Sequence, residues 1–278
     1  MSFTQMLEKA HSDNHSMLCV GLDPEPSKFP TSFNGKKDAI FDFCTSIVDA
    51  THDLAIAFKP QIAYFAAHQA EDQLARLIRH IKRVAPHIPV ILDAKRGDIG
   101  ATSQQYAVEA FERYEADAVT LSPFMGFDSI EPYLKYKNKG VFLLCRTSNK
   151  GGDDFQNLRL ADKPGNPTLY EYIAQLAERD WNTSGQLGLV VGATYPTEIS
   201  KVRAIAPSLP LLIPGVGAQG GDAVATVRAG MTKRGAVLIN SSRAILYASQ
   251  GSDFEASART KALETRDLLN AATLDNHP

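Results

Sequence analysis

The segment 93–98, Asp-Ala-Lys-Arg-Gly-Asp, places four ionisable side chains directly after the apolar run Val90–Leu92. Unpaired charges are costly to bury, so charged groups at the end of a buried strand are usually paired, solvated or engaged in chemistry. Alternation along a strand puts Asp93 and Lys95 on one side, and Asp98 can return to that side or face a neighbouring subunit. Such an acid–lysine–acid cluster can keep a lysine protonated and direct it at a substrate. A solvated loop with salt bridges is the simpler alternative, because short motifs often match by chance.

The composition of the 278 residues is that of an ordinary globular protein with a net charge of −2. This balance predicts no nucleic-acid partner. No apolar run approaches the ~20 residues that cross a bilayer, and the N-terminus shows no signal peptide. The three cysteines lie far apart and show no metal-ligand spacing, so neither a metal site nor a disulfide framework is expected. We therefore expect a cytoplasmic protein that does not bind membranes.

Short apolar runs rich in β-branched residues recur along the chain, and segments with helical periodicity follow them. Most of these runs are continuously apolar, as expected of parallel strands that are covered on both faces. The runs are Met17–Leu22, Ala55–Lys59, Val90–Ala94, Ala118–Leu121, Val141–Cys145, Leu187–Val191, Leu211–Ile213 and Ala236–Asn240. Eight strand–helix units in a chain of this length predict an α/β protein with a (β/α)8 TIM barrel.

A doubly wound open sheet is the alternative fold, but its dinucleotide-binding version is disfavoured. The G-x-G-x-x-G pattern is absent after the first expected strand, where Gly21-Leu22-Asp23-Pro24 stands instead. The chain shows no linker and no repeat of fixed period, so we expect a single domain over residues 1–278 with an N-terminal helical segment. The irregular segment 149–167 predicts a long loop after the fifth strand that can act as a flap over the site.

In such a barrel the functional groups lie where the strands end. The first strand ends at Asp23, which a simple turn before Pro24 would also explain. The second ends at Lys59, whose ammonium must reach water or an anion, either as a functional group or as a snorkelling lysine. The fourth and fifth strands lead into 122–126 and 146–149, which offer hydroxyl and amide groups for a polar ring edge.

A phosphate site is expected after the last two strands. The seventh leads into the glycine-rich run Pro214–Asp222, and the eighth leads to Arg243. Glycine lets backbone N–H groups approach an anion, and a guanidinium can bind phosphate through paired hydrogen bonds. Loops at these two positions form the usual phosphate site of this barrel, although a merely flexible loop is possible. We expect Gln219 and Arg243 to hold the phosphate of a small substrate whose other end lies near the charged cluster.

Taken together, these motifs resemble the orotidine 5′-phosphate decarboxylase family, in its longer microbial branch. The resemblance covers nearly the whole chain and rests on Gly21–Pro24, Phe58–Pro60, Asp93–Thr102, Pro214–Asp222 and Ser241–Arg243. It implies a lyase that converts orotidine 5′-phosphate to UMP and carbon dioxide in de novo pyrimidine synthesis. It also implies that the enzyme uses no metal and no organic cofactor, and that it forms a homodimer with shared active sites.

The resemblance implies a role for each candidate residue. Lys95 should donate the proton to ring carbon six, while Asp93 and Asp98 organise the charges around it. Asp23 should bond the ribose, and Lys59 should bridge the ribose and the charged cluster. The other expected substrate contacts are Thr102, which enters with Asp98 from the second subunit, Ser148 at the pyrimidine amide edge, Pro214 in the substrate-binding loop, and Gln219 and Arg243 at the phosphate.

Three other functions stay open at this point. A barrel decarboxylase acting on a phosphorylated sugar acid, related to 3-keto-gulonate 6-phosphate decarboxylase, would share the Asp-x-Lys-x-x-Asp pattern but use magnesium, so chelators would distinguish it. A Schiff-base aldolase would use Lys59 or Lys95 and form a covalent adduct with its substrate. A non-catalytic phosphate-ligand sensor would keep the barrel and lose the chemistry.

Overall fold

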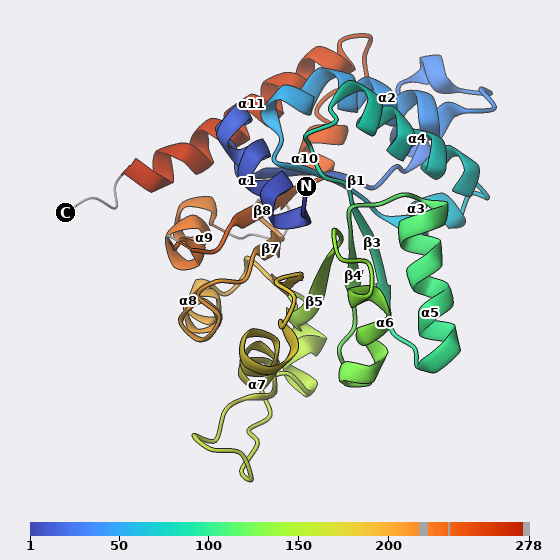
Figure 1. Ribbon diagram of the computed structural model, residues 1–278. Coiled ribbons are helices and arrows are strands. Elements are labelled where there is room, and N and C mark those ends of the chain that lie inside the picture. Colours follow the sequence, from blue (N-terminus) through green and yellow to red (C-terminus); the bar gives the residue numbers. More distant parts are fainter. Residues whose placement is uncertain (217–221, 233, 275–278) are drawn as a thin grey trace.

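The computed structural model describes residues 1–216, 222–232 and 234–274, in which parallel strands are surrounded by helices (Figure 1). Within these residues the strands are β1 (Leu18–Leu22), β2 (Ala57–Pro60), β3 (Ile91–Arg96), β4 (Ala118–Leu121), β5 (Gly140–Arg146), β6 (Leu187–Val191), β7 (Leu211–Pro214) and β8 (Val237–Ser241). Each of them overlaps one of the expected apolar runs. The expected strands are therefore confirmed, with shifts of one or two residues at their ends.

The strands close into a barrel. Their order is β2-β1-β8-β7-β6-β5-β4-β3, and all neighbouring pairs are parallel. Parallel bridges from Phe58 to Val90 and from Gln61 to Asp93 join the two outermost strands, and Phe58 N donates to Pro89 O at 3.1 Å. The (β/α)8 barrel is thereby confirmed, and all strands end at the same rim.

Helices cover the outside of the barrel. They are α1 (Phe3–Asn14), α2 (Ala39–Thr51), α3 (Ile62–Ala66), α4 (Glu71–Val84), α5 (Gly100–Val108), α6 (Glu131–Leu134), α7 (Leu169–Leu176), α8 (Pro196–Ile205), α9 (Ala223–Gly230), α10 (Arg243–Leu246) and α11 (Phe254–Leu274). In α4 the apolar side chains at helical spacing, from Leu74 to Ile81, are buried against the strands. The segment before α7 extends away from the barrel as a loop (Figure 1).

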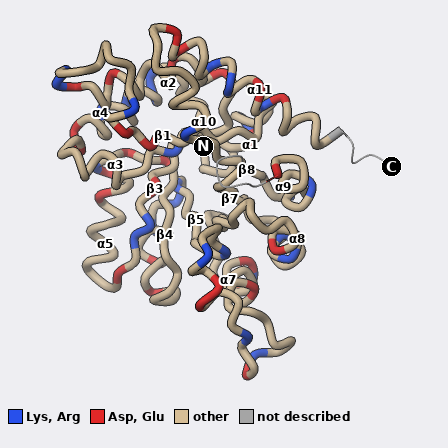
Figure 2. Tube along the Cα trace, turned by 180° about the vertical axis from the view of Figure 1, so that it is seen from behind, with Lys and Arg blue, Asp and Glu red and all other residues tan. Residues whose placement is uncertain are grey.

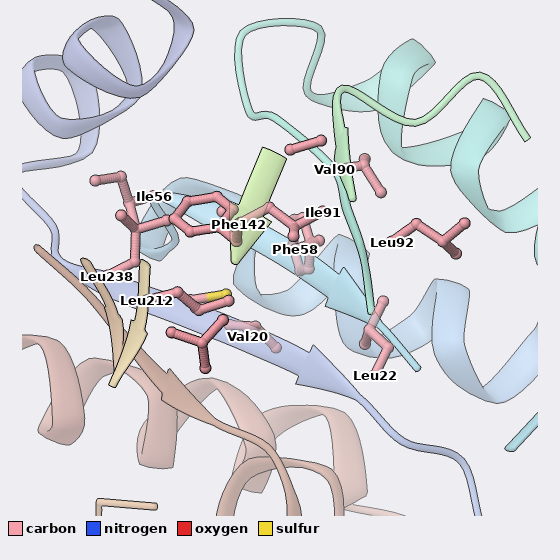
Figure 3. Packing of buried hydrophobic residues seen from close by; sticks show 14 of the residues in the cluster. Val20, Leu22, Ile56, Phe58, Val90, Ile91, Leu92, Phe142, Leu212 and Leu238 are labelled. Atoms are coloured by element: carbon pink, nitrogen blue, oxygen red, sulfur yellow. The ribbon is translucent and has the colours of Figure 1, made fainter. Parts of the chain in front are cut away.

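Apolar side chains fill the barrel interior and close its amino-terminal end. Leu212 and Leu238 are neighbours in the β7–β8 ladder and lie close to Phe142 of β5 in the interior (Figure 3). At the amino-terminal end, Phe3 from α1 lies edge-on to Phe142 of β5, with ring centroids 5.7 Å apart. The packing of Phe3 on Phe142 therefore closes the interior of the barrel at this end.

The helices carry charges of both signs on their outer faces. Lysine, arginine and acidic residues are mixed along α4, α8 and α11 (Figure 2). None of the helices in the described ranges is long and apolar enough to cross a membrane.

Candidate active site

Strand β3 is irregular where the charged cluster begins. Its register against β4 shifts between Leu92 and Arg96, and Lys95 has a φ of 48°. Left-handed backbone is uncommon outside glycine and is often found at functional sites. The hydroxyl of Thr120 on β4 accepts hydrogen bonds from Ala94 N and Lys95 N, both at 3.0 Å. The Thr120 hydroxyl therefore accepts hydrogen bonds from two backbone N–H groups that the irregularity leaves outside the β3–β4 ladder.

The Asp93 carboxylate is the centre of the site. Its Oδ2 accepts from Lys59 Nζ at 2.8 Å, and its Oδ1 accepts from Lys95 Nζ at 2.6 Å. Thr120 Oγ1 also donates to Asp93 Oδ1, at 2.9 Å. Asp93 and Lys59 are buried, whereas the Lys95 side chain is 46 % exposed. The expectation that Asp93 and Lys95 face one side is confirmed, and strand β2 adds Lys59 to them.

The three groups stabilise each other's charges. Burial alone would raise the pKa of the Asp93 carboxyl, but the ammonium groups of Lys59 and Lys95 outweigh burial and hold that pKa well below its ordinary value. Burial would likewise lower the pKa of Lys59, but the nearby Asp93 and Asp23 carboxylates outweigh it and raise the pKa above the usual lysine value. The site therefore holds one fixed negative charge between two ammonium groups.

A cavity of about 170 Å³ opens beside this cluster, among the ends of β1, β2, β3, β7 and β8. Its polar lining includes Asp23, Lys59, Asp93, Asn240 and Arg243. Asp23 Oδ1 and Asn240 Oδ1 are buried there and have no hydrogen-bond donor among the described residues. Buried acceptors without donors indicate a place where a ligand or a water molecule supplies the missing hydrogen bond. Pro214 also lines the cavity, and its role in substrate binding stays a prediction.

Two neighbours shape the wall that carries Asp23. Tyr247 Oη donates to Asp23 O at 2.9 Å and accepts from Glu25 N at 2.7 Å, so it fixes the turn after β1. A Cβ on Gly21 would overlap the Ser242 hydroxyl, so the absence of a side chain at Gly21 lets the ends of β1 and β8 approach each other.

The structure does not bring every candidate residue to this cavity. Asp98 Oδ1 accepts from Ile99 N at 2.8 Å, and Thr102 is exposed on α5. Neither contacts the Asp93 cluster within the described part of the chain. Ser148 lies just beyond β5 and is not among the residues that line the cavity. Gln219 lies outside the described residues.

Two arginines near the strand ends turn away from the cavity. Arg96 pairs with Glu109 on the outside of the barrel, at 2.9 Å, and lies over the Tyr106 ring. Arg146 is buried at the end of β5 and pairs with Asp153 at 2.6 Å and with Glu198 at 3.2 Å. Both are therefore structural cations, although they stand in sequence beside candidate site residues.

Sequence reasoning missed three residues of the site. Thr120 lies in the expected strand Ala118–Leu121, and its polar type directly before the last residue of that strand is the available signal. Asn240 is the residue before the last of the buried strand β8 and offers the same signal. Tyr247 gave none, because its contact with Asp23 joins residues at opposite ends of the chain.

The fold and the position of these groups define the chain as a (β/α)8-barrel enzyme whose polar site lies at the carboxyl ends of the strands. Across the ranges that the structure describes, three or more His, Cys, Asp or Glu side chains nowhere come together as a metal-binding group.

Comparison with known proteins identifies the family. A sequence model of the orotidine 5′-phosphate decarboxylase / HUMPS family matches residues 16–258. An orotidine 5′-phosphate decarboxylase of Polaromonas naphthalenivorans is 69 % identical over 276 residues, which are 99 % of this chain and 98 % of the relative. The same enzyme of Paracidovorax citrulli is 70 % identical over 272 residues, which are 98 % of this chain and 99 % of the relative. The solved structure of Leishmania donovani OMP decarboxylase superposes with a TM-score of 0.84 at 40 % identity and covers 99 % of both chains. The chain belongs to the orotidine 5′-phosphate decarboxylase / HUMPS family, which confirms the resemblance seen in the sequence.

Proposed function

We propose that this protein is a carboxy-lyase that converts orotidine 5′-phosphate to UMP and carbon dioxide in pyrimidine biosynthesis. The observation that carries the proposal is the Asp93 carboxylate held between the ammonium groups of Lys59 and Lys95, at the strand ends of a chain from this family. Relatives that match over nearly their full length bear the name of this enzyme.

The chemistry needs a fixed positive charge near ring carbon six. Loss of carbon dioxide leaves an electron pair there that the ring cannot delocalise well, so preorganised charges must stabilise it. The ammonium of Lys95 is half-exposed and is aimed by Asp93, so we assign to it the stabilisation of this pair and the donation of the proton. Asp93 would then lie beside the departing carboxylate. Lys59 holds the other oxygen of Asp93 and keeps the carboxylate in place.

The cavity wall on β1, β7 and β8 suits a ribose phosphate. Asp23 offers a buried acceptor for a sugar hydroxyl, next to Lys59. Arg243 is exposed at the far end of the cavity, where its guanidinium can bind a phosphate group. We propose that Gln219 joins it, and that Ser148 recognises the amide edge of the pyrimidine.

We propose a homodimer in which Asp98 and Thr102 complete the partner's site. Both residues lie on the β3–α5 side of the rim, away from their own Asp93 cluster. Large apolar side chains are exposed on the adjoining loops, at Ile99, Phe124, Met125 and Phe127, and Phe124 is 85 % exposed. An exposed apolar patch next to incomplete polar groups favours an interface with a second copy of the chain.

We also propose that residues 1–278 act as one domain. The helices at the two ends of the chain pack on the same barrel and on each other. Asn270 Nδ2 of α11 donates to His15 O at the end of α1, at 2.7 Å. The Phe254 ring of α11 lies edge-on to Phe33, with centroids 5.5 Å apart. A single cooperative unfolding transition, seen alike by calorimetry and by tryptophan fluorescence, is the expected result.

The decisive measurement is the loss of orotidine 5′-phosphate absorbance with the purified protein, with and without EDTA. Turnover that EDTA leaves unchanged is expected. Absence of turnover, or activity on a phosphorylated sugar acid that requires added Mg²⁺, would overturn the proposal. Mixing inactive Lys95→Ala and Asp98→Ala subunits should restore activity, because each mixed dimer carries one intact site. No recovery after demonstrated subunit exchange would overturn the shared site alone.

A further inference from the structure

A side chain from the loop after β5 holds the end of that strand, next to Ser148. Thr147 N donates to Gln156 Oε1 at 2.8 Å, and Gln156 Nε2 donates to the Thr147 hydroxyl at 2.9 Å. Strand β5 ends at Arg146, so the Gln156 amide supplies at Thr147 the kind of hydrogen bond that a neighbouring strand supplies within β5. Two bonds in opposite directions between one amide and one residue fix both the position and the orientation of the backbone.

Gln156 is itself held in place by Arg146, the last residue of β5. The buried guanidinium of Arg146 donates to Gln156 Oε1 at 3.2 Å and to Asp153 Oδ1 at 2.6 Å. Gly152 leaves the space for this arrangement, because a Cβ there would lie 2.7 Å from Arg146 Nη1 and 3.0 Å from Gln156 Oε1. The orientation of the Gln156 amide is therefore set by a buried cation and not by solvent.

Ser148 is also confined from its other side. Gly192 follows β6, and its N–H donates to Arg146 O at 2.8 Å. A Cβ on Gly192 would lie 2.7 Å from Ser148 Cβ and 2.8 Å from Ser148 N. Ser148 is thus held by direct packing on Gly192 and, through Thr147, by Gln156. Misplacement of a binding group by about 1 Å can cost roughly 100-fold in rate, so such support has functional consequences.

We infer that Gln156 is a positioning residue, which fixes Ser148 against the base of the nucleotide and so determines recognition at the pyrimidine end. This inference rests on the proposed function, in which Ser148 binds the pyrimidine amide edge. The groups assigned to ribose and phosphate, Asp23 and Arg243, follow β1 and β8. Among the described residues no hydrogen bond links either of them to Gln156. Removal of the Gln156 amide therefore weakens binding of the base and spares the ribose phosphate.

The test compares two ligands that differ only in the base. Affinities of UMP and of ribose 5-phosphate are measured by calorimetry for the wild type and for Gln156→Ala. We expect UMP to bind about 10-fold more weakly and ribose 5-phosphate to change by less than about twofold. In the turnover assay, KM for orotidine 5′-phosphate rises together with the UMP dissociation constant. Gln156→Glu keeps an oxygen acceptor for Thr147 N and for Arg146, so it should restore most of the UMP affinity.

Asn182→Ala is the matched control. Asn182 Oδ1 accepts from Leu187 N at 2.9 Å, so it also holds strand backbone with a side-chain amide, but at the start of β6 and at the opposite end of the barrel. Asn182→Ala should lower the thermal unfolding midpoint much as Gln156→Ala does. It should leave the affinities of both ligands unchanged, because the strand that it supports lies far from the site.

Equal losses for UMP and ribose 5-phosphate in Gln156→Ala, or no loss for either, would overturn the inference. If Gln156→Ala does not fold, Thr147→Val decides, since it removes the hydroxyl bonds and keeps the Thr147 N–H bond. A loss of about threefold that is confined to UMP supports the inference, and equal effects on both ligands overturn it. Failure of the proposed function shows separately, as a wild type that does not turn over orotidine 5′-phosphate.

Discussion

Buried charges occur at both ends of the barrel, and their surroundings differ. At the amino-terminal end, the Arg203 guanidinium donates to four backbone carbonyl groups, among them Gly230 O at the end of α9, at 2.6 Å, and Leu209 O at 2.7 Å. Asp117 at the same end accepts from Val90 N at 3.0 Å and from Lys82 Nζ at 2.8 Å. These charges use their hydrogen bonds to join loops that precede the strands.

At the carboxyl end the polar groups are only partly satisfied by the chain itself. Lys95 keeps a half-exposed ammonium on a left-handed backbone. Asp23 and Asn240 each leave one buried oxygen without a donor among the described residues. Such features lower stability and persist where function requires them. The comparison teaches that a buried charge by itself does not mark a site; at the carboxyl end the charges lie beside a cavity that is also lined by buried acceptors without donors among the described residues.

The largest expected effect comes from Lys95→Ala. Turnover of orotidine 5′-phosphate should fall by at least about 1,000-fold, because the proton donor and the charge nearest the reacting carbon are both lost. The unfolding midpoint should stay near that of the wild type, since the side chain is half-exposed. Lys82→Ala is the matched control, because Lys82 also donates to a buried aspartate at 2.8 Å, but at the amino-terminal end. Near-normal turnover by Lys95→Ala would remove Lys95 as the proton donor.

Asp117→Ala should lower stability and leave activity unchanged, which is the reverse of the effect expected for Lys95→Ala. It leaves Val90 N without its partner and two lysines without their counter-ion, so the free energy of unfolding should fall by about 3 kcal/mol. The folded variant should keep the kcat/KM of the wild type, because Asp117 lies at the far end of the barrel. Urea unfolding and the turnover assay check both parts. A large loss of kcat/KM in the folded protein would contradict the separation of the two ends.

The pH dependence of stability should reveal the Asp93 cluster. The pKa of Asp93 is depressed in the folded protein, so its contribution is present above the unfolded pKa of about 4 and is lost as the pH falls. The raised pKa of Lys59 keeps that group charged up to alkaline pH. Near pH 7, the unfolding free energies of the wild type and Asp93→Asn, measured by urea unfolding, should therefore differ by about 2 kcal/mol. The two values should converge as the pH falls below about 4. A gap that stays constant with pH would show that Asp93 is not held ionised by its neighbours.

The sequence predicted the fold well because of how parallel barrel strands are buried. Runs such as Leu187–Val191 are covered on both faces, so they are continuously apolar and can be located without knowledge of the fold. The cluster at Asp93 and Lys95 was also predictable, since its members are close in sequence. The contacts of Thr120 and Tyr247 were not, because they depend on residues 25 or more positions away. Arg146 shows the same limit, since its buried partners come from a later loop and from α8.

Two glycines, one inside β6 and one directly after it, test the comparison at its smallest scale. A Cβ on Gly188, inside β6, would lie 2.7 Å from the Phe142 ring, and one on Gly192 would lie 2.7 Å from Ser148 Cβ. Both Gly188→Ala and Gly192→Ala should therefore lower the free energy of unfolding by about 1–2 kcal/mol through overpacking. Only Gly192→Ala should weaken UMP binding, because the strain at Gly188 is taken up by core side chains and the strain at Gly192 displaces the residue assigned to the base. Equal effects of both variants on UMP affinity would mean that Ser148 tolerates displacement, and that the base is recognised elsewhere on the rim.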